Sequence, residues 1–327
     1  MRKYIFRGGG CQKRERAACG EGMEPLTLAQ QPGKMDCNLK PGTETHMTTY
    51  KQRTLNFLRE EWGTFIERFQ RLPADEGARR VKAQGYESLR DLLAHVLAWW
   101  EEGFPIIQAI AENRNFERKK YDFDVFNAEA VKKYGTWNEA EFLARFESCR
   151  RDMEAGLRSM EDAVFENRRV RGWLNAVVIS HAREHHMLPG RFLPLDTLEN
   201  EWGGYIERFH ALAPDQQAEF LSKQGFETFH DLLAHIIGWM EETLRGINET
   251  LEGSGRVWEN RDTDAVNAEW IARFHNWSDA DLFAHFENMR KAALDAVMDL
   301  PDDAFSNKDI EEWLAADVVG HFDDHAL

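Results

Sequence analysis

The sequence is short of cysteine, of positive charge and of long apolar runs. Its four cysteines (Cys11, Cys19, Cys37 and Cys149) have neither the CxxC spacing of zinc ribbons nor the density of a disulfide scaffold, which indicates a reducing compartment. The formal net charge of -16 opposes binding to nucleic-acid phosphates or to an anionic bilayer. No stretch approaches the roughly 20 apolar residues that cross a bilayer, and no secretory signal is recognisable. We therefore expect a cytoplasmic protein without nucleic-acid or membrane partners.

The sequence does contain an internal repeat. Sliding the chain by 140 residues aligns 55–187 with 195–327 without a gap, and about a third of the paired residues are identical. Pro189, Gly190 and Pro194 lie between the two copies and favour a turn. The sequence thus predicts a tandem duplication with four parts: a disordered tail at 1–46, a first repeat at 47–188, a linker at 189–194 and a second repeat at 195–327.

Apolar residues recur at steps of three and four in four segments of each repeat, and no segment alternates long enough to predict a strand. In the first repeat these segments begin at Leu55, at Leu89 after Ser88 as a cap, near Asn138 and near Trp173. The predicted fold is all-α. We expect two tandem four-helix bundles, each with a long crossover connection between helices two and three.

Histidine marks the candidate site. Of twelve histidines, only six occupy matched positions in the two repeats: His95 with His235, His181 with His321, and His185 with His325. The last two pairs are four residues apart on helix four and project from one face, while helix two can aim the third imidazole at the same point. Three imidazoles suit zinc, nickel, copper or iron and leave a coordination position open. The competing interpretation is that each histidine is an interior residue bonded to a carbonyl or carboxylate, but the duplicated triad favours a metal.

The run from Asp91 to Trp99, followed by His181-x-x-x-His185, resembles the DinB/YfiT-like family of four-helix bundles. The second repeat matches through His235, Trp239, His321 and His325. The resemblance implies one metal histidine on helix two and two on helix four, a zinc or nickel ion, and dimers. It also implies hydrolases or transferases that use low-molecular-weight thiols, with a related ClbS/DfsB-like branch that includes a protective hydrolase.

Three polar residues recur in the long connection: Asp124, Asn127 and Glu129, matched by Asp264, Asn267 and Glu269. They could touch a substrate, but a short helix capped by the aspartate is the favoured interpretation. The matched tryptophans are expected in the core or a pocket wall, and Cys149 is expected to be a buried apolar residue.

Two functions fit these features. The first is a metal-dependent hydrolase or thiol S-transferase that acts on a small electrophilic compound. The second is a non-catalytic bundle that sequesters a small ligand or the metal itself. In either case the two repeats are expected to pack as a pseudo-dimer within one chain.

Overall fold

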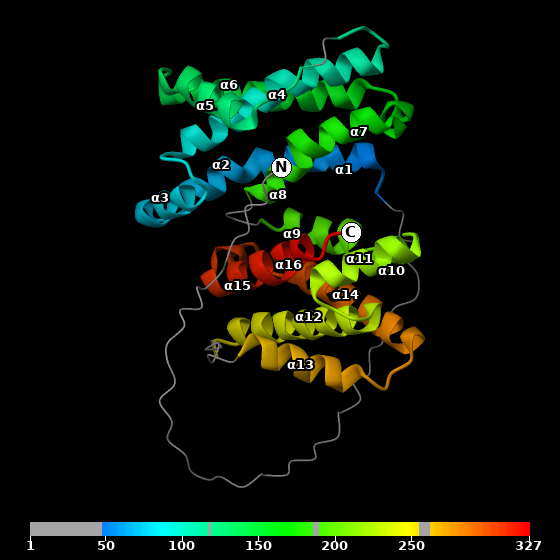
Figure 1. Ribbon diagram of the computed structural model, residues 1–327. Helices are drawn as coiled ribbons and strands as arrows, with labels where there is room; N and C mark the ends of the chain where they lie inside the picture. The colour runs from blue at the N-terminus through cyan, green and yellow to red at the C-terminus, as the bar shows by residue number, and fades with distance from the viewer. Residues whose placement is uncertain (1–47, 117–118, 186–189, 255–261) are drawn as a thin grey trace. The chain divides into compact units, whose positions relative to one another are not determined.

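Helices make up all the regular secondary structure that the computed structural model describes, namely residues 48–116, 119–185, 190–254 and 262–327 (Figure 1). This agrees with the predicted all-α fold. The predicted disordered tail and Cys11, Cys19 and Cys37 lie outside the described residues. None of the described helices combines the length and apolar composition that crossing a bilayer requires.

The first repeat has four long helical segments and two shorter helices. Two of the long segments are composite, because α-helical and π-helical turns follow one another in them without a break. In chain order the elements are α1 (Tyr50–Asn56), η1 (Phe57–Trp62), α2 (Gly63–Gln70), α3 (Ala74–Ala83), α4 (Leu89–Ala111), α5 (Phe123–Gly135), α6 (Glu139–Ser159), η2 (Asp162–Glu166), α7 (Arg168–Leu174), η3 (Asn175–Ser180) and α8 (His181–Glu184).

The same order of elements returns in the second repeat. Its two longest helices start and end 140 residues after their counterparts. The elements are α9 (Phe192–Asp196), η4 (Thr197–Glu201), α10 (Tyr205–His210), α11 (Pro214–Gln224), α12 (Phe229–Leu251), α13 (Thr263–Phe274), α14 (Asp279–Asp299), η5 (Asp302–Ser306), α15 (Lys308–Trp313), η6 (Leu314–Gly320) and α16 (His321–Asp324).

Side-chain caps fix where the longest helices begin. The hydroxyl of Ser88 accepts the backbone N–H of Asp91, and Asn138 accepts that of Glu141. Each of these bonds satisfies one of the N–H groups that a first helical turn leaves free. The predicted starts of helices two and three are therefore confirmed. Helix four begins at Arg168, five residues before the predicted Trp173, because Asn167 caps it.

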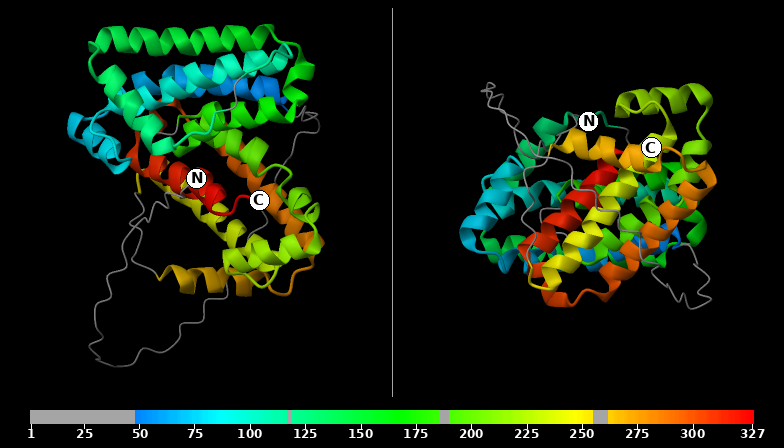
Figure 2. Two further views of the ribbon diagram at one scale, coloured as in Figure 1. Left: turned by 45° about the horizontal axis from the view of Figure 1, so that its top comes forward. Right: turned by 90° about the horizontal axis from the view of Figure 1, so that it is seen from below.

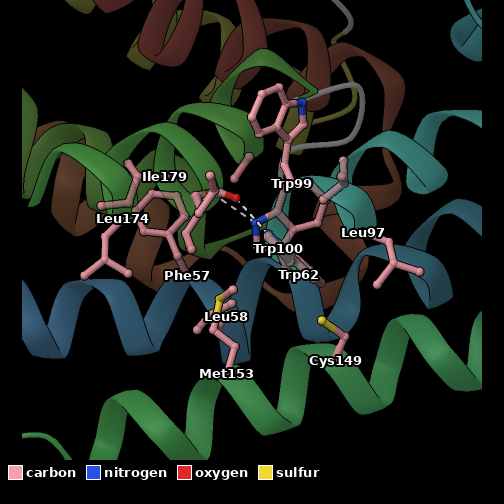
Figure 3. Packing of buried hydrophobic residues seen from close by; sticks show 14 of the residues in the cluster. Phe57, Leu58, Trp62, Leu97, Trp99, Trp100, Cys149, Met153, Leu174 and Ile179 are labelled. Carbon is pink, nitrogen blue, oxygen red and sulfur yellow. Dashed lines mark hydrogen bonds between the residues drawn. The ribbon is translucent and has the colours of Figure 1, made fainter. Parts of the chain in front are cut away.

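Helices α4 and α12 form the centre of the two repeats. α4 contacts α5, α6 and α7, while α12 contacts α13, α14 and α15 (Figure 2). In the first core the rings of Trp62 and Trp100 meet edge to face, with centroids 5.3 Å apart (Figure 3). Cys149 is buried in the same core, as predicted, and burial raises the pKa of its thiol to about 11.

Two of the shorter helices, α3 and α11, were not predicted. In α3 only Gly77 and Val81 are buried, so its apolar stripe is too short to give a clear helical period. The long connection, in contrast, contains the expected short helix, α5. Its cap is Asp122, whose carboxylate accepts the N–H of Val125, and Asp124 lies inside the first turn.

The predicted linker at 189–194 partly belongs to a helix. α9 begins at Phe192 and includes Pro194, which a first helical turn tolerates because its missing N–H would have no partner there. Leu193 is buried within the first hydrophobic core, and the ring of Phe192 meets that of Phe57 at 4.9 Å. The segment therefore packs between the repeats instead of only joining them.

Candidate metal centre

The structure brings the three histidines of each repeat together. His95 lies on α4, and His181 and His185 lie at the two ends of α8. His235, His321 and His325 have the same places on α12 and α16. Within each triad one ring nitrogen of every histidine lies within 4.8 Å of the others. The grouping of these six residues follows the sequence prediction.

A π-helical turn stands directly before the first histidine of each pair. In η3 the carbonyl of Val177 accepts the indole N–H of Trp100 at 2.7 Å, and that of Val178 accepts the indole of Trp62 at 3.1 Å. Carbonyls displaced from the regular helical ladder by a π turn need such donors. The buried tryptophans therefore stabilise the turn that delivers His181 to the site.

The second repeat keeps only part of this arrangement. Trp202 donates its indole N–H to the carbonyl of Val318 in η6 at 3.3 Å. Met240 takes the place of Trp100 and has no N–H to donate. The π turn before His321 is thus held by one indole where the first repeat uses two.

The ring nitrogens are spaced as ligands of one ion. In the first triad His95 Nε2 lies 3.0 Å from His185 Nε2. In the second, His235 Nε2 lies 3.0 Å from His321 Nε2 and 3.3 Å from His325 Nε2. Tetrahedral zinc with Zn–N bonds of about 2.05 Å separates its nitrogen ligands by about 3.3 Å.

Side-chain amides fix the tautomers of several imidazoles. His185 donates its Nδ1–H to Gln84 Oε1 at 2.9 Å, and His325 donates to Gln224 Oε1 at 2.8 Å. His235 donates its Nδ1–H to Asn267 Oδ1 at 3.1 Å. A neutral imidazole with its hydrogen on Nδ1 has a lone pair on Nε2. These three rings therefore direct lone pairs into their triads.

The second triad indicates most clearly that its residues suit a bound metal ion. His235 and His325 both have their hydrogen on Nδ1, so two bare lone pairs face each other across 3.3 Å. No hydrogen bond can form between two acceptors, whereas a cation bound between them would be attracted by both. The residues present therefore fit a divalent metal ion of the kind that accepts imidazole.

Burial keeps five of the six histidines uncharged. It lowers the pKa of His95 to about 3, with the nearby His181 adding to the effect. Burial likewise lowers the pKa of His181 and of His235 to about 4, and that of His325 to about 3. The pKa of His321 also falls well below its usual value through burial and its two histidine neighbours. Neutral imidazole is the form that binds metal.

Aromatic rings cover the helix-two ligand of each site. Tyr86 stacks on the ring of His95 with centroids 4.9 Å apart, and Phe226 lies 5.2 Å from the ring of His235. Trp239 meets His321 at 6.3 Å. These walls exclude water from one side of each triad, which explains the low pKa values.

Of the residues singled out in the long connection, Asn267 contacts a histidine of the site. Asn267 accepts hydrogen bonds from His235 and Trp239, while Asn127 accepts one from Trp99 at 2.9 Å. Asp124 and Asp264 lie in the first turns of α5 and α13. The predicted short helices are present, but the prediction that these two aspartates cap them is wrong, because Asp122 and Asp262 are the caps.

Sequence reasoning missed Gln84 and Gln224. They stand at the ends of α3 and α11, the two helices that were not predicted. A signal was present, because these glutamines are identical at matched positions of the two repeats. The comparison that selected the histidines would have selected them as well.

A family model provides an independent comparison. The model described as the DinB superfamily matches residues 57–188, a range that contains His95, His181 and His185. No curated protein and no solved structure matches the chain. The first repeat is therefore identified as a DinB superfamily domain.

Proposed function

We propose that each repeat binds one divalent metal ion, zinc or nickel, through its three histidines. The proposal rests on one observation above all: the facing lone pairs of His235 and His325 at 3.3 Å, with both Nδ1–H groups already donated to amide oxygens. The family membership supports the same choice of ligands.

We further propose that the bound ions serve an enzyme acting on a small electrophilic compound, as a hydrolase or a thiol S-transferase. A divalent ion with three protein ligands lowers the pKa of a bound water or thiol. The chain's own part is to hold the imidazoles neutral, to fix their tautomers through Gln84 and Gln224, and to keep water from one side with aromatic rings.

A second candidate function is supported by burial. His95, His185, His235 and His325 are each less than a tenth exposed, which also suits a protein that binds or sequesters a metal without turning over a substrate. The partners of the enzyme function are a small-molecule substrate and a low-molecular-weight thiol. Neither nucleic acid nor membrane is a proposed partner, because of the acidic composition.

Metal content tests the binding. We expect two divalent ions per chain by elemental analysis of the purified protein, and none in the variant with His181→Ala and His321→Ala. The single variants should each keep one ion. If neither zinc nor nickel binds after reconstitution, the triads are core histidines and the proposal is wrong.

Cobalt substitution then separates the two functions. Co²⁺ in an open three-histidine site changes its visible spectrum when azide or a thiol is added, because the added group occupies the free position. A spectrum that responds supports the enzyme and justifies screening hydrolysis and thiol transfer. A spectrum indifferent to both additives supports the closed, non-catalytic site.

A further inference from the structure

The two triads differ in how the helix-two histidine is held. In the second repeat Asn267 Oδ1 accepts the Nδ1–H of His235 at 3.1 Å and the indole N–H of Trp239 at 3.2 Å. In the first repeat the matching Asn127 Oδ1 accepts the indole of Trp99 at 2.9 Å. The Nδ1 atom of His95 is buried and has no hydrogen-bond partner within the part of the chain that the structure describes.

The hydrogen bonding of the helix-two histidine affects how readily each triad binds a metal ion. His185 already donates its Nδ1–H to Gln84, so the hydrogen between His185 Nε2 and His95 Nε2 belongs to His95. To offer a lone pair to an ion, His95 must carry its hydrogen on Nδ1 instead. The carbonyl of Leu92 favours protonation of His95, but it makes no hydrogen bond with Nδ1. The new N–H would therefore be less well satisfied than the Nδ1–H of His235, which Asn267 accepts at 3.1 Å.

We propose that Asn267 is a positioning residue of the second triad and that the second site binds its ion more tightly than the first. This inference rests on the proposed metal-binding function. An outer hydrogen bond that fixes a ligating histidine contributes about 10-fold to 100-fold in metal affinity. Asn267 provides such a bond and Asn127 does not.

The remaining outer contacts do not reverse the order. Gln84 and Gln224 hold His185 and His325 equally well, at 2.9 and 2.8 Å. On helix four, the Nδ1 atom of His181 lies 3.4 Å from the carbonyl of Val177, beyond the usual range for a good N–H···O bond. The matching His321 Nδ1 has no partner among the described residues, so His321 meets a cost of the same kind as His95 when its hydrogen moves to Nδ1. The first site thus has one well-formed outer hydrogen bond and the second has two.

The packing around the two asparagines differs in the same place. Behind Trp239, the ring of Trp270 lies edge to face at 4.9 Å and occupies the space beside Gly238. The first repeat has Ala98 and Ala130 at these positions, and Phe126 packs against Trp99 at 4.2 Å. The aromatic rings around Asn267 on α13 therefore differ from those around Asn127 on α5.

Competitive titration of the full chain tests the inference. Zn²⁺ is added to the metal-free protein at pH 7 in the presence of a chelating dye, and binding should occur in two steps at least 10-fold apart in affinity. His235→Ala should remove the tight step, and His95→Ala the weak one. Equal affinities, or loss of the tight step in His95→Ala, would overturn the proposal.

Matched variants identify the residue responsible. Asn267→Ala should weaken the tight step about 10-fold, while Asn127→Ala at the equivalent position should change neither step. Asn267→Asp keeps an acceptor and should retain the tight step, and Trp239→Phe removes only the indole donor and should do the same. Equal weakening by Asn127→Ala and Asn267→Ala would overturn the assignment of Asn267.

The controls separate this inference from the proposed function. Absence of bound metal in the unmodified chain refutes the metal proposal itself. Two ions bound with equal affinity refute only the inference. The visible spectrum of Co²⁺ at partial loading, compared between Asn267→Ala and Asn267→Asp, reports which site is filled without any assay of activity.

Discussion

Arg183 forms an ion pair with Asp323, the residue at its own position in the other repeat. Arg183 Nε lies 3.0 Å from Asp323 Oδ1, and the guanidinium also donates to the hydroxyl of Thr197 at 2.9 Å. A residue that meets its counterpart lies on the two-fold axis of a symmetric pair. The contact supports the pseudo-dimer expected within the chain. Two identical repeats would instead bring two like charges together at this point.

This pair predicts an unequal response to mutation. Asp323→Leu removes the carboxylate that pairs with the buried guanidinium of Arg183 and should lower the free energy of unfolding by about 2–4 kcal/mol. Arg183→Met should lower it less, because the side chain of Asp323 is 39% exposed and stays hydrated. The double variant should have a free energy of unfolding close to that of the unmodified chain. Urea denaturation of the four proteins measures the coupling, and additive losses would show that the two residues do not interact.

Gly238 and Trp270 predict a second pair of coupled effects. A Cβ atom at Gly238 would lie 2.2 Å from Trp270 Cδ2, so Gly238→Ala should lower stability by about 1–3 kcal/mol despite the better helix propensity of alanine. In a Trp270→Ala background the same change should stabilise α12. Thermal unfolding checks the reversal of sign. A loss of stability in both backgrounds would contradict this account.

Asp317 predicts a stability effect that depends on pH. Burial raises the pKa of its carboxyl to about 7, opposed by Thr243, whose hydroxyl lies 3.5 Å away. The folded state therefore holds a proton that the unfolded state has lost above about pH 4, and this contribution to stability falls as the pH rises to about 7. The free energy of unfolding of Asp317→Asn should equal that of the unmodified protein at low pH. At pH 8 it should be higher, by about 4 kcal/mol at most, because the side chain of Asp317 is only partly buried.

Denaturation at several pH values between 5 and 8 measures that difference directly. The first repeat has Gly103 and Val177 at the positions of Thr243 and Asp317, so Val177→Ala is a matched control. The control should lose the same stability at every pH. A difference between Asp317→Asn and the unmodified chain that stays constant with pH would contradict the raised pKa.

The low pKa values of the histidines predict metal binding that releases few protons. At pH 6, three histidines of ordinary pKa near 6.5 would release roughly two protons per ion. With pKa values of about 4 for His235 and about 3 for His325, and with that of His321 well below its ordinary value, the second triad should release close to none. Calorimetry of Zn²⁺ binding in two buffers of different ionisation enthalpy counts these protons. Release of two protons per site would show that the triads are open to water.

The sequence predicted most of what depends on local pattern. Apolar periodicity located the long helices, and Ser88 and Asn138 marked two of their starts. Spacing and repetition selected the six histidines because a metal site needs several ligands of one type at one point. The Nδ1 partner Gln84 was missed, because it comes from a helix with almost no apolar stripe and its match with Gln224 was not followed up. The pairing of Arg183 with Asp323 depends on how the repeats pack, which no pattern within one helix encodes.

The π turns carry a consequence for deletion genetics. Each of η3 and η6 holds more residues per turn than an α-helix, so a one-codon deletion within Asn175–Ser180 could be absorbed by closing the turn into regular helix. The helix would survive and His181 and His185 would keep their orientation toward α4, whereas a one-codon deletion in the regular helix of Arg168–Leu174 would rotate both histidines by about 100°. A frame-preserving allele of the second kind would keep every ligand codon and still dismantle the triad.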